Sequence, residues 1–263
     1  MDNILVPALS QTKKVLIGLG EEWFYDYKNI SNDIDYKNLL EKACLNHEWL
    51  IPFIQYHYMK NHDDSRTRAF TKLADLIKDK DYFIVSTIYD FSNKDNLFDS
   101  SRMVFPCGNI EYLQQKQSRD GELISVEESE DFAQLMQQID KALKNNGELS
   151  EIKRVIYGND ELIFNQKRRE WSKAQYNESA YLAQWNNYQR WLSGTLSEDL
   201  LILELGVGLE YPTVIRFPFE KIAYINNKAY MIRVHEKLYQ LTEQISKKAV
   251  SVQGNSMDYI KQV

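Results

Sequence analysis

The sequence predicts an α/β fold, in which a Rossmann-like, doubly wound and mainly parallel sheet carries a smaller helical and hairpin subdomain. Continuous apolar runs rich in β-branched residues, such as Lys13–Gly20 and Asp81–Asp90, are typical of strands buried on both faces of a sheet. Helical patterns lie between these runs. Glycines follow several of the apolar runs, and glycines are typical of the ligand-binding edge of such sheets.

The expected elements alternate along the chain. The expected strands are Lys13–Gly20, Asp81–Asp90, Arg102–Pro106, Leu200–Gly206, Thr213–Phe219 and Ala229–His235. The expected helices are Tyr36–Leu45, Glu48–Met59, Arg66–Lys78, Ser129–Asn146, about Arg168–Leu192 and a C-terminal helix from Glu236. Ser129–Asn146 is the clearest helix, because Ser129 is a good N-cap and Gly147 a good terminator. Val155–Phe164 has the turn residues of a hairpin at its centre.

Composition bounds the class of protein. The chain has 263 residues, of which 43% are hydrophobic, 27% charged and 13% aromatic, which excludes low-complexity and disordered chains. A net charge of −6 disfavours a nucleic-acid binder. No apolar run reaches the roughly 18 residues of a membrane span, and the start MDNILVPAL lacks the basic segment of a signal peptide. Two distant cysteines, Cys44 and Cys107, suit a reducing compartment, so we expect a cytoplasmic protein.

Several segments carry a family resemblance. ILELGVGLEYPTVIRFPFEKI, residues 202–222, and YMIRVH, residues 230–235, resemble the C-terminal half of sirtuins, most closely a bacterial branch related to the ADP-ribosylating sirtuins. Upstream, VLIGLG stands at the Gly-Ala-Gly turn that cradles the dinucleotide diphosphate in that family. STIYD, residues 86–90, stands at the Asn-x-Asp stretch, and FPCGNIEYLQQ, residues 105–115, at the catalytic His-Gly or Gln-Gly. The resemblance covers most of the chain and implies one sirtuin-like domain over residues 1–263.

The diphosphate turn departs from the family pattern. Gly18 and Gly20 keep the permissive backbone, but Glu21, Glu22 and Trp23 follow where sirtuins have small or hydroxyl residues. One carboxylate 4 Å from a phosphate costs about 4 kcal/mol at an effective dielectric constant near 20. A carboxylate at a helix amino end also satisfies the helix dipole by itself. We therefore expect Glu22 to occupy the phosphate's place, with a working phosphate loop as the alternative.

The residues at the catalytic positions also differ from the family pattern. The family's Asn matches Ile88, which cannot hydrogen-bond a ribose hydroxyl. Asp90 matches the Asp that recognises the nicotinamide amide, although an Asp that merely caps the turn after a strand is equally expected. The catalytic His or Gln matches Cys107, and a thiol acts as a base only when a cation or a helix end activates it. We expect a buried, inert cysteine; a redox or nucleophilic thiol is the alternative.

The adenosine side of the site matches best. The resemblance places the turn Gly206, Val207 and Gly208 against the adenosine, and His235 at the Asn that contacts the adenosine ribose. A tight turn after a strand requires the same glycines without any ligand, and a histidine at a strand end needs no ligand either. These residues therefore support the fold more than the function.

Sirtuins carry four zinc-binding cysteines after the catalytic position, and this chain has none of them. The first matches Gln115, and no cysteine lies between Gln115 and Val263. We therefore expect no metal site and no zinc. Residues 108–165 are expected to form a small subdomain that replaces the zinc ribbon, and residues 30–80 a helical insertion.

Two functions follow from these residues. The first is a catalytically degenerate sirtuin relative that binds NAD or ADP-ribose weakly at best and acts through a protein partner or as a homo-oligomer, without nucleic acid or membrane. The alternative is an active NAD-consuming enzyme with rewired residues: a protein ADP-ribosyltransferase, a deacylase or an NAD hydrolase. In that alternative Glu22, Asp90, Cys107 and His235 carry the chemistry.

Overall fold

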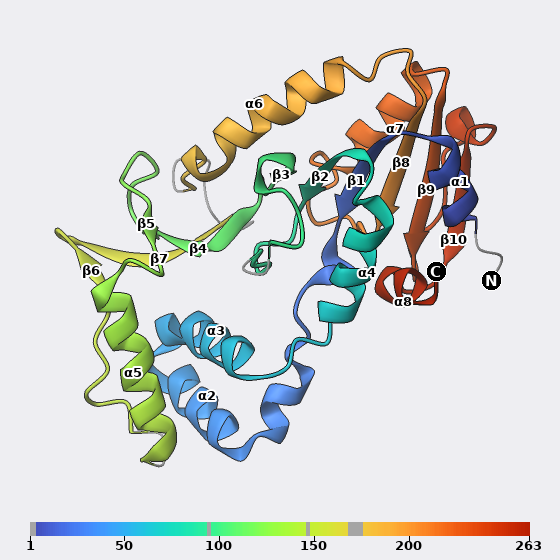
Figure 1. Cartoon of the computed structure of the whole chain (residues 1–263). Helices are drawn as coiled ribbons and strands as arrows, with labels where there is room; N and C mark the ends of the chain where they lie inside the picture. Colours follow the sequence, from blue (N-terminus) through green and yellow to red (C-terminus); the bar gives the residue numbers. More distant parts are fainter. Residues whose placement is uncertain (1–3, 94–95, 146–147, 168–175) are drawn as a thin grey trace. The chain divides into compact units, whose positions relative to one another are not determined.

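The computed structural model describes residues 4–93, 96–145, 148–167 and 176–263 (Figure 1). The chain divides into two compact units. Unit 1 comprises Met1–Phe24, Arg66–Gly108 and Tyr181–Val263, and unit 2 comprises Tyr25–Ser65 and Asn109–Ala180.

Unit 1 is built on a parallel sheet. In the described residues the sheet has six strands in the order β10-β9-β8-β1-β2-β3, and each neighbouring pair is parallel. The strands are β1 (Lys14–Leu19), β2 (Asp81–Ser86), β3 (Met103–Val104), β8 (Leu200–Leu205), β9 (Ala229–His235) and β10 (Ala249–Gln253). The mainly parallel, doubly wound sheet predicted from the apolar runs is confirmed.

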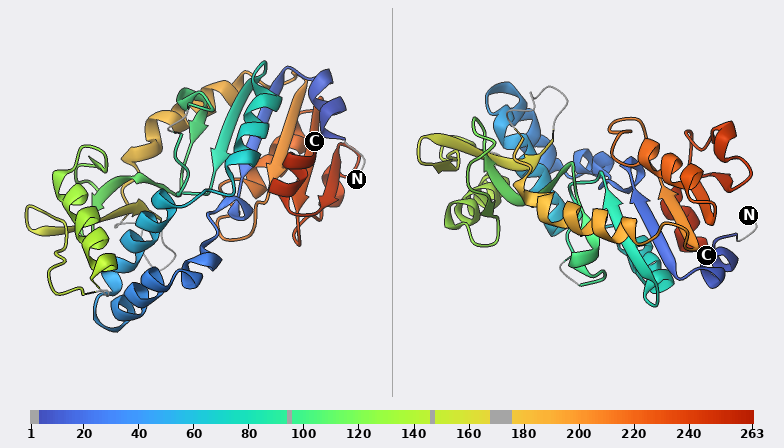
Figure 2. Two further views of the ribbon diagram at one scale, coloured as in Figure 1. Left: turned by 60° about the horizontal axis from the view of Figure 1, so that its bottom comes forward. Right: turned by 90° about the horizontal axis from the view of Figure 1, so that it is seen from above.

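Helices cover both faces of this sheet (Figures 1 and 2). Alternate side chains of β1 point to opposite faces: Val15 and Ile17 join one core cluster, and Leu16 joins the other. The helices of the first face are α1 (Leu5–Gln11), α4 (Thr67–Ile77) and α8 (Ser256–Gln262). Those of the second are α6 (Ser179–Ser193), most of which belongs to unit 1, and α7 (Arg216–Ile225). Burial on both faces explains why the strands read as unbroken apolar runs.

Two expected elements of unit 1 are wrong. The run Thr213–Phe219 is not a strand: it comprises the turn before α7 and the first residues of that helix, from Arg216. Pro218 lies in the first turn of that helix, where a missing N–H costs nothing, whereas in a central strand it would remove a ladder bond. The expected helix from Glu236 is also wrong, because this segment leads through the short turn Glu243–Ile245 into β10, and a helix begins only at Ser256.

In its described residues, unit 2 combines three α-helices with a small sheet. The helices are α2 (Ile34–Asn46), α3 (Ile51–Asn61) and α5 (Glu130–Lys144). The strands are ordered β5 (Ile124–Ser125), β4 (Gly108–Gln115), β7 (Asp160–Gln166) and β6 (Ile156–Tyr157). Gly108, the first residue of β4, ends the middle segment of unit 1. The Ser129 side chain accepts a hydrogen bond from the Phe132 amide, so the predicted cap of α5 is confirmed. The hairpin prediction is also confirmed by β6 and β7.

The expected helix over Arg168–Leu192 begins later than predicted. The structure describes α6 from Ser179, and residues 168–175 lie outside the described residues. Gly147, the predicted terminator of α5, lies outside them as well.

A buried histidine links the three helices of unit 2. The His57 side chain is 5% exposed, its Nδ1 lies 2.8 Å from the Tyr36 hydroxyl, and its Nε2 lies 3.3 Å from Oδ1 of Asp140. The Asn61 amide nitrogen also faces Nδ1 at 3.3 Å. Tyr36 and Asn61 can both donate to Nδ1, which favours the imidazole with its proton on Nε2. Burial lowers the pKa of His57 below its ordinary value, although Asp140 opposes this shift.

The lowered pKa predicts a pH dependence of stability. Below about pH 6.5 the unfolded chain takes up a proton at His57 that the folded chain does not, so the free energy of unfolding falls as the pH falls. One such group contributes at most about 1.4 kcal/mol per pH unit. Between pH 7.5 and 5.5 the free energy of unfolding is expected to fall in both proteins. In His57→Gln the fall should be smaller than in the parent by roughly 1 kcal/mol. Guanidinium unfolding at several pH values measures both slopes, and equal slopes would refute the assignment.

Candidate functional site

The candidate site lies at the carboxyl ends of the parallel strands of unit 1. Two glycine turns meet there, one after β1 and one after β8. The Gly20 amide donates to the Leu205 carbonyl at 3.0 Å, and a Cβ atom on Gly20 would lie 2.3 Å from the Val207 Cα. Gly206 has a φ of +63°, which glycine adopts without strain. The backbones of the two turns therefore approach each other more closely than other residues would permit.

The Glu22 carboxylate caps two further strand ends. It accepts hydrogen bonds from the backbone amides of Glu236, after β9, and Ser256, at the start of α8, both at 2.8 Å. It also lies 3.2 Å from Nδ1 of His235, and its side chain is only 11% exposed. Hydrogen bonds to a charged acceptor contribute about 1.5–3 kcal/mol each. Glu22 is therefore held among the strand ends.

Its neighbour Glu21 does the same for the turn after β8. The Glu21 carboxylate accepts from the backbone amides of Gly208 and of Glu210, the latter at 3.1 Å. Together the two glutamates hold four backbone N–H groups. Such convergent N–H groups are what proteins use to bind a phosphate or another anion, and in this chain two of its own carboxylates accept from them.

His235 ends β9 as part of the same arrangement. Its Nδ1 accepts from the backbone amides of Lys237 at 3.0 Å and Leu238 at 3.1 Å. Burial and the nearby Arg216 lower the pKa of His235, while Glu22, Glu21 and Glu236 oppose the shift. The ring therefore caps the turn that follows its own strand.

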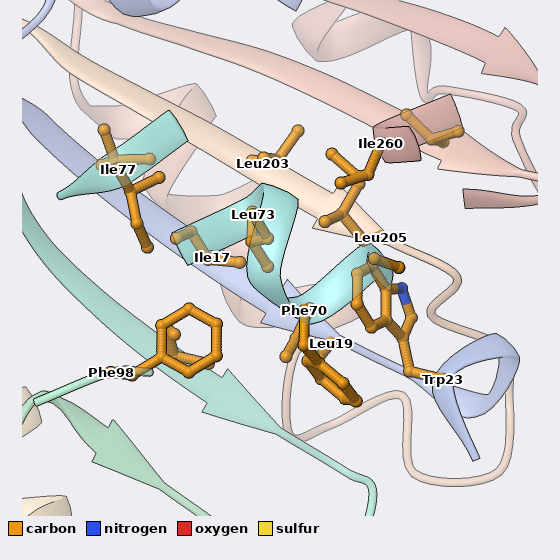
Figure 3. Packing of buried hydrophobic residues seen from close by; sticks show 14 of the residues in the cluster. Ile17, Leu19, Trp23, Phe70, Leu73, Ile77, Phe98, Leu203, Leu205 and Ile260 are labelled. Atoms are coloured by element: carbon orange, nitrogen blue, oxygen red, sulfur yellow. The ribbon is translucent and has the colours of Figure 1, made fainter. Parts of the chain in front are cut away.

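Trp23 anchors the short turn Glu21–Trp23, which carries the two glutamates, to the hydrophobic core. Its side chain is fully buried, its indole N–H donates to the Ser256 hydroxyl at 3.0 Å, and its ring lies 4.9 Å from the ring of Phe70 (Figure 3). The short turn Glu21–Trp23 thus points its two carboxylates to the strand ends and its indole into the apolar cluster.

Asp90 lies beyond the end of β2 and is 3% exposed. Arg66, which is 2% exposed, donates from Nη1 to Oδ1 of Asp90 at 2.8 Å and to the Trp23 carbonyl at 3.0 Å, and from Nη2 to the Asp90 carbonyl at 3.2 Å. A buried charge is costly unless it is paired. The Asp90 carboxylate is thus committed to a buried ion pair with a residue that the sequence analysis did not single out.

The other two catalytic positions are buried. Ile88 and Cys107 are both 0% exposed, and Ile88 belongs to the apolar cluster around Trp23. Of the residues singled out in the sequence, the structure brings together Gly20, Glu22, Gly206–Gly208 and His235. Gly18 lies within β1, where a Cβ atom would meet the side chains of Ile215 and Phe219.

A network of buried charged side chains lies next to the glycine turn that follows β8. Arg233 of β9 makes a bidentate pair with Glu204 of β8, at 2.6 and 2.9 Å, and a third contact with Glu220 of α7 at 2.8 Å. Arg216 donates to the Val207 carbonyl at 2.9 Å and to the Leu238 carbonyl at 2.7 Å. The network therefore ties the turn after β8 to the loop after β9.

The part of the chain that the structure describes contains neither a cluster of metal-ligating side chains nor a helix suited to crossing a membrane. No group of three or more His, Cys, Asp or Glu side chains there is placed to hold a metal ion. No helix in those residues has both the length and the apolar character that crossing a membrane requires.

Comparison with known proteins identifies the fold. No protein-family model and no curated protein sequence matches the chain. Solved Sir2 (sirtuin) structures do match. A structure described in work on the mechanism and regulation of Sir2 enzymes matches with a TM-score of 0.52 and 13% identity over 98% of this chain and 92% of that one. Sir2Tm bound to a propionylated peptide gives 0.52 and 12%, over 98% and 94%. A mutant Sir2 homologue in complex with ADP-ribose gives 0.50 and 11%, over 100% and 94%. The chain therefore has a sirtuin-like fold.

Proposed function

We propose that this chain is a catalytically degenerate sirtuin relative whose dinucleotide site is filled by its own Glu21 and Glu22, and which acts by binding a protein partner. One observation carries the proposal: four backbone N–H groups at the strand ends donate to these two carboxylates. A diphosphate would compete for the same donors. To admit it, Glu22 would have to give up two charge-assisted hydrogen bonds or remain as a repelling charge.

The catalytic positions support the same proposal. Turnover of NAD needs a group that activates a ribose hydroxyl and groups that hold the nicotinamide end. The Ile88 side chain offers no hydrogen bond, and Asp90 is paired with Arg66 in the core. Cys107 is buried. The matching residues thus serve packing and ion pairing within unit 1.

The proposal also includes the family branch, the cellular location and the mode of action of this chain. The ELGVG turn and the IRFPF segment support a place in the bacterial branch related to the ADP-ribosylating sirtuins. A cytoplasmic location is inferred from cysteine usage. Protein partners or self-association are the modes of action that need no intact dinucleotide site.

Calorimetric titration with NAD and ADP-ribose tests the proposal. The parent protein is expected to bind NAD no more favourably than about −5 kcal/mol, a Kd of roughly 0.2 mM or weaker, and to release no nicotinamide above background. Glu22→Ser is expected to tighten ADP-ribose binding by about tenfold, because it removes a like charge and frees two N–H donors. It should not restore turnover.

Glu236→Ser is the matched control. It removes an equal charge from the neighbouring turn after β9, but its exposed side chain is not the group that accepts from the donors. Weaker binding by Glu22→Ser than by the parent would make Glu22 a ligand contact. Tight NAD binding with nicotinamide release by the parent would establish the NAD-consuming alternative.

A further inference from the structure

The outer face of α7 is apolar although it faces solvent. Phe217, Tyr224 and Ile225 are 55%, 57% and 55% exposed, respectively. At 100° per residue, these three side chains and Lys221 fall within one arc of the helix. The buried Phe219 lies roughly opposite this arc.

This pattern is unusual for a helix at the edge of a domain. A surface helix has one apolar face, and a helix that is apolar on two faces is typically covered on both. Single exposed apolar residues are common and need no explanation. Here three large ones lie on one face of a ten-residue helix, Phe217 in its first turn and Tyr224 and Ile225 in its last, and the inner face of this helix already packs on the sheet. The arrangement indicates a surface that another molecule covers.

The charged residues of α7 indicate the chemistry of the molecule that covers this face. Arg216 and Glu220 belong to the buried network next to the glycine turn. Lys221 is exposed and makes no ion pair with any residue that the structure describes. It lies four residues after Phe217 and three before Tyr224, so the helical spacing places Lys221 on the same face, between these apolar side chains. An occupant that buried this face would have to offer Lys221 a carboxylate, because a buried unpaired charge is costly.

The central position of Lys221 argues against a second copy of this chain. A two-fold pairing of α7 with itself would bring two stripes together about their centres, and so place one ammonium group against the other. A membrane surface is also disfavoured. One exposed lysine adds little attraction to anionic lipids, and the chain as a whole carries −6 charges.

We propose that the outer face of α7, formed by Phe217, Lys221, Tyr224 and Ile225, binds an acidic amphipathic segment of a partner protein. The apolar side chains of that segment cover the two rings and Ile225, and one of its carboxylates pairs with Lys221. The inference rests on the binding role proposed above. Its test involves no nucleotide, so its failure and the failure of the self-filled dinucleotide site are separate results.

Site-specific cross-linking tests this surface in the full chain. The photoreactive residue p-benzoylphenylalanine replaces Tyr224 in cells that normally make the protein, and cross-linked peptides are sequenced by mass spectrometry. The control position is Leu196, which is 62% exposed in the loop after α6. We expect one predominant partner segment at position 224 that is amphipathic, net negative and not found at position 196.

A synthetic peptide of that segment then provides the affinity test. Lys221→Glu and Phe217→Ser are each expected to weaken its binding at least tenfold in fluorescence anisotropy, and Leu196→Ser to leave it unchanged. Four results would overturn the proposal: no cross-link above the control position, a cross-link to the same chain or to a second copy, a basic segment, or affinity that ignores Lys221→Glu. Co-sedimentation with phosphatidylserine vesicles that Phe217→Ser abolishes would overturn it in favour of a membrane.

Discussion

Replacing Arg233 with methionine is expected to lower the free energy of unfolding by about 3–5 kcal/mol. Arg233 is 1% exposed and holds Glu204, which is 0% exposed, through two hydrogen bonds. Without the guanidinium group, Glu204 keeps a buried charge with only the more distant Arg216, 3.7 Å away, to oppose it. Burial already raises the pKa of Glu204. Guanidinium unfolding followed by tryptophan fluorescence measures the loss.

A double variant separates the charge from the packing. Because a buried ion pair can be replaced by apolar residues at little cost, Arg233→Met with Glu204→Leu is expected to recover most of the lost stability. Arg190→Met is the surface control, since Arg190 is exposed on α6, and should stay within about 0.5 kcal/mol of the parent. Equal losses in the single and double variants would show that the network contributes shape and not charge compensation.

Asp90→Ala is expected to destabilise the protein by a similar amount, about 3–5 kcal/mol. The reason is Arg66, which is 2% exposed and would stay in the core without the carboxylate that balances its charge, although the carbonyls of Trp23 and residue 90 still accept from it. Adding Arg66→Met to Asp90→Ala should restore part of the loss, because it removes the stranded charge. Thermal and denaturant unfolding of the three variants measure these differences.

This prediction also separates the two functions. If Asp90 served the recognition of nicotinamide, Asp90→Ala would keep the stability of the parent and lose nicotinamide release. In the proposed protein the variant loses stability, and there is no release to lose. An Asp90→Ala variant that unfolds at the same denaturant concentration as the parent would contradict the structural role of the ion pair.

Local sequence was enough to predict most of the sheet. Four strands could be recognised from their apolar residues alone, because a strand buried on both faces of a sheet is a continuous apolar run. These strands are β1, β2, β8 and β9. The start of α5 was also predictable, because its cap bond joins residues three positions apart. α7 was not, since its apolar outer face resembles a strand until Pro218 is placed in the first turn of a helix.

The candidate site divides in the same way. The sequence by itself determined that Gly20, Gly206 and Gly208 lie at strand ends and that Glu21 and Glu22 bring negative charge to the first of these turns. Which groups those carboxylates meet was decided only by the tertiary structure, because the amides of Glu236 and Ser256 lie 214 and 234 residues from Glu22. The partners of Asp90 and Glu204 were decided there too. A buried charge requires a partner, but no local pattern states which arginine the folded chain brings to it.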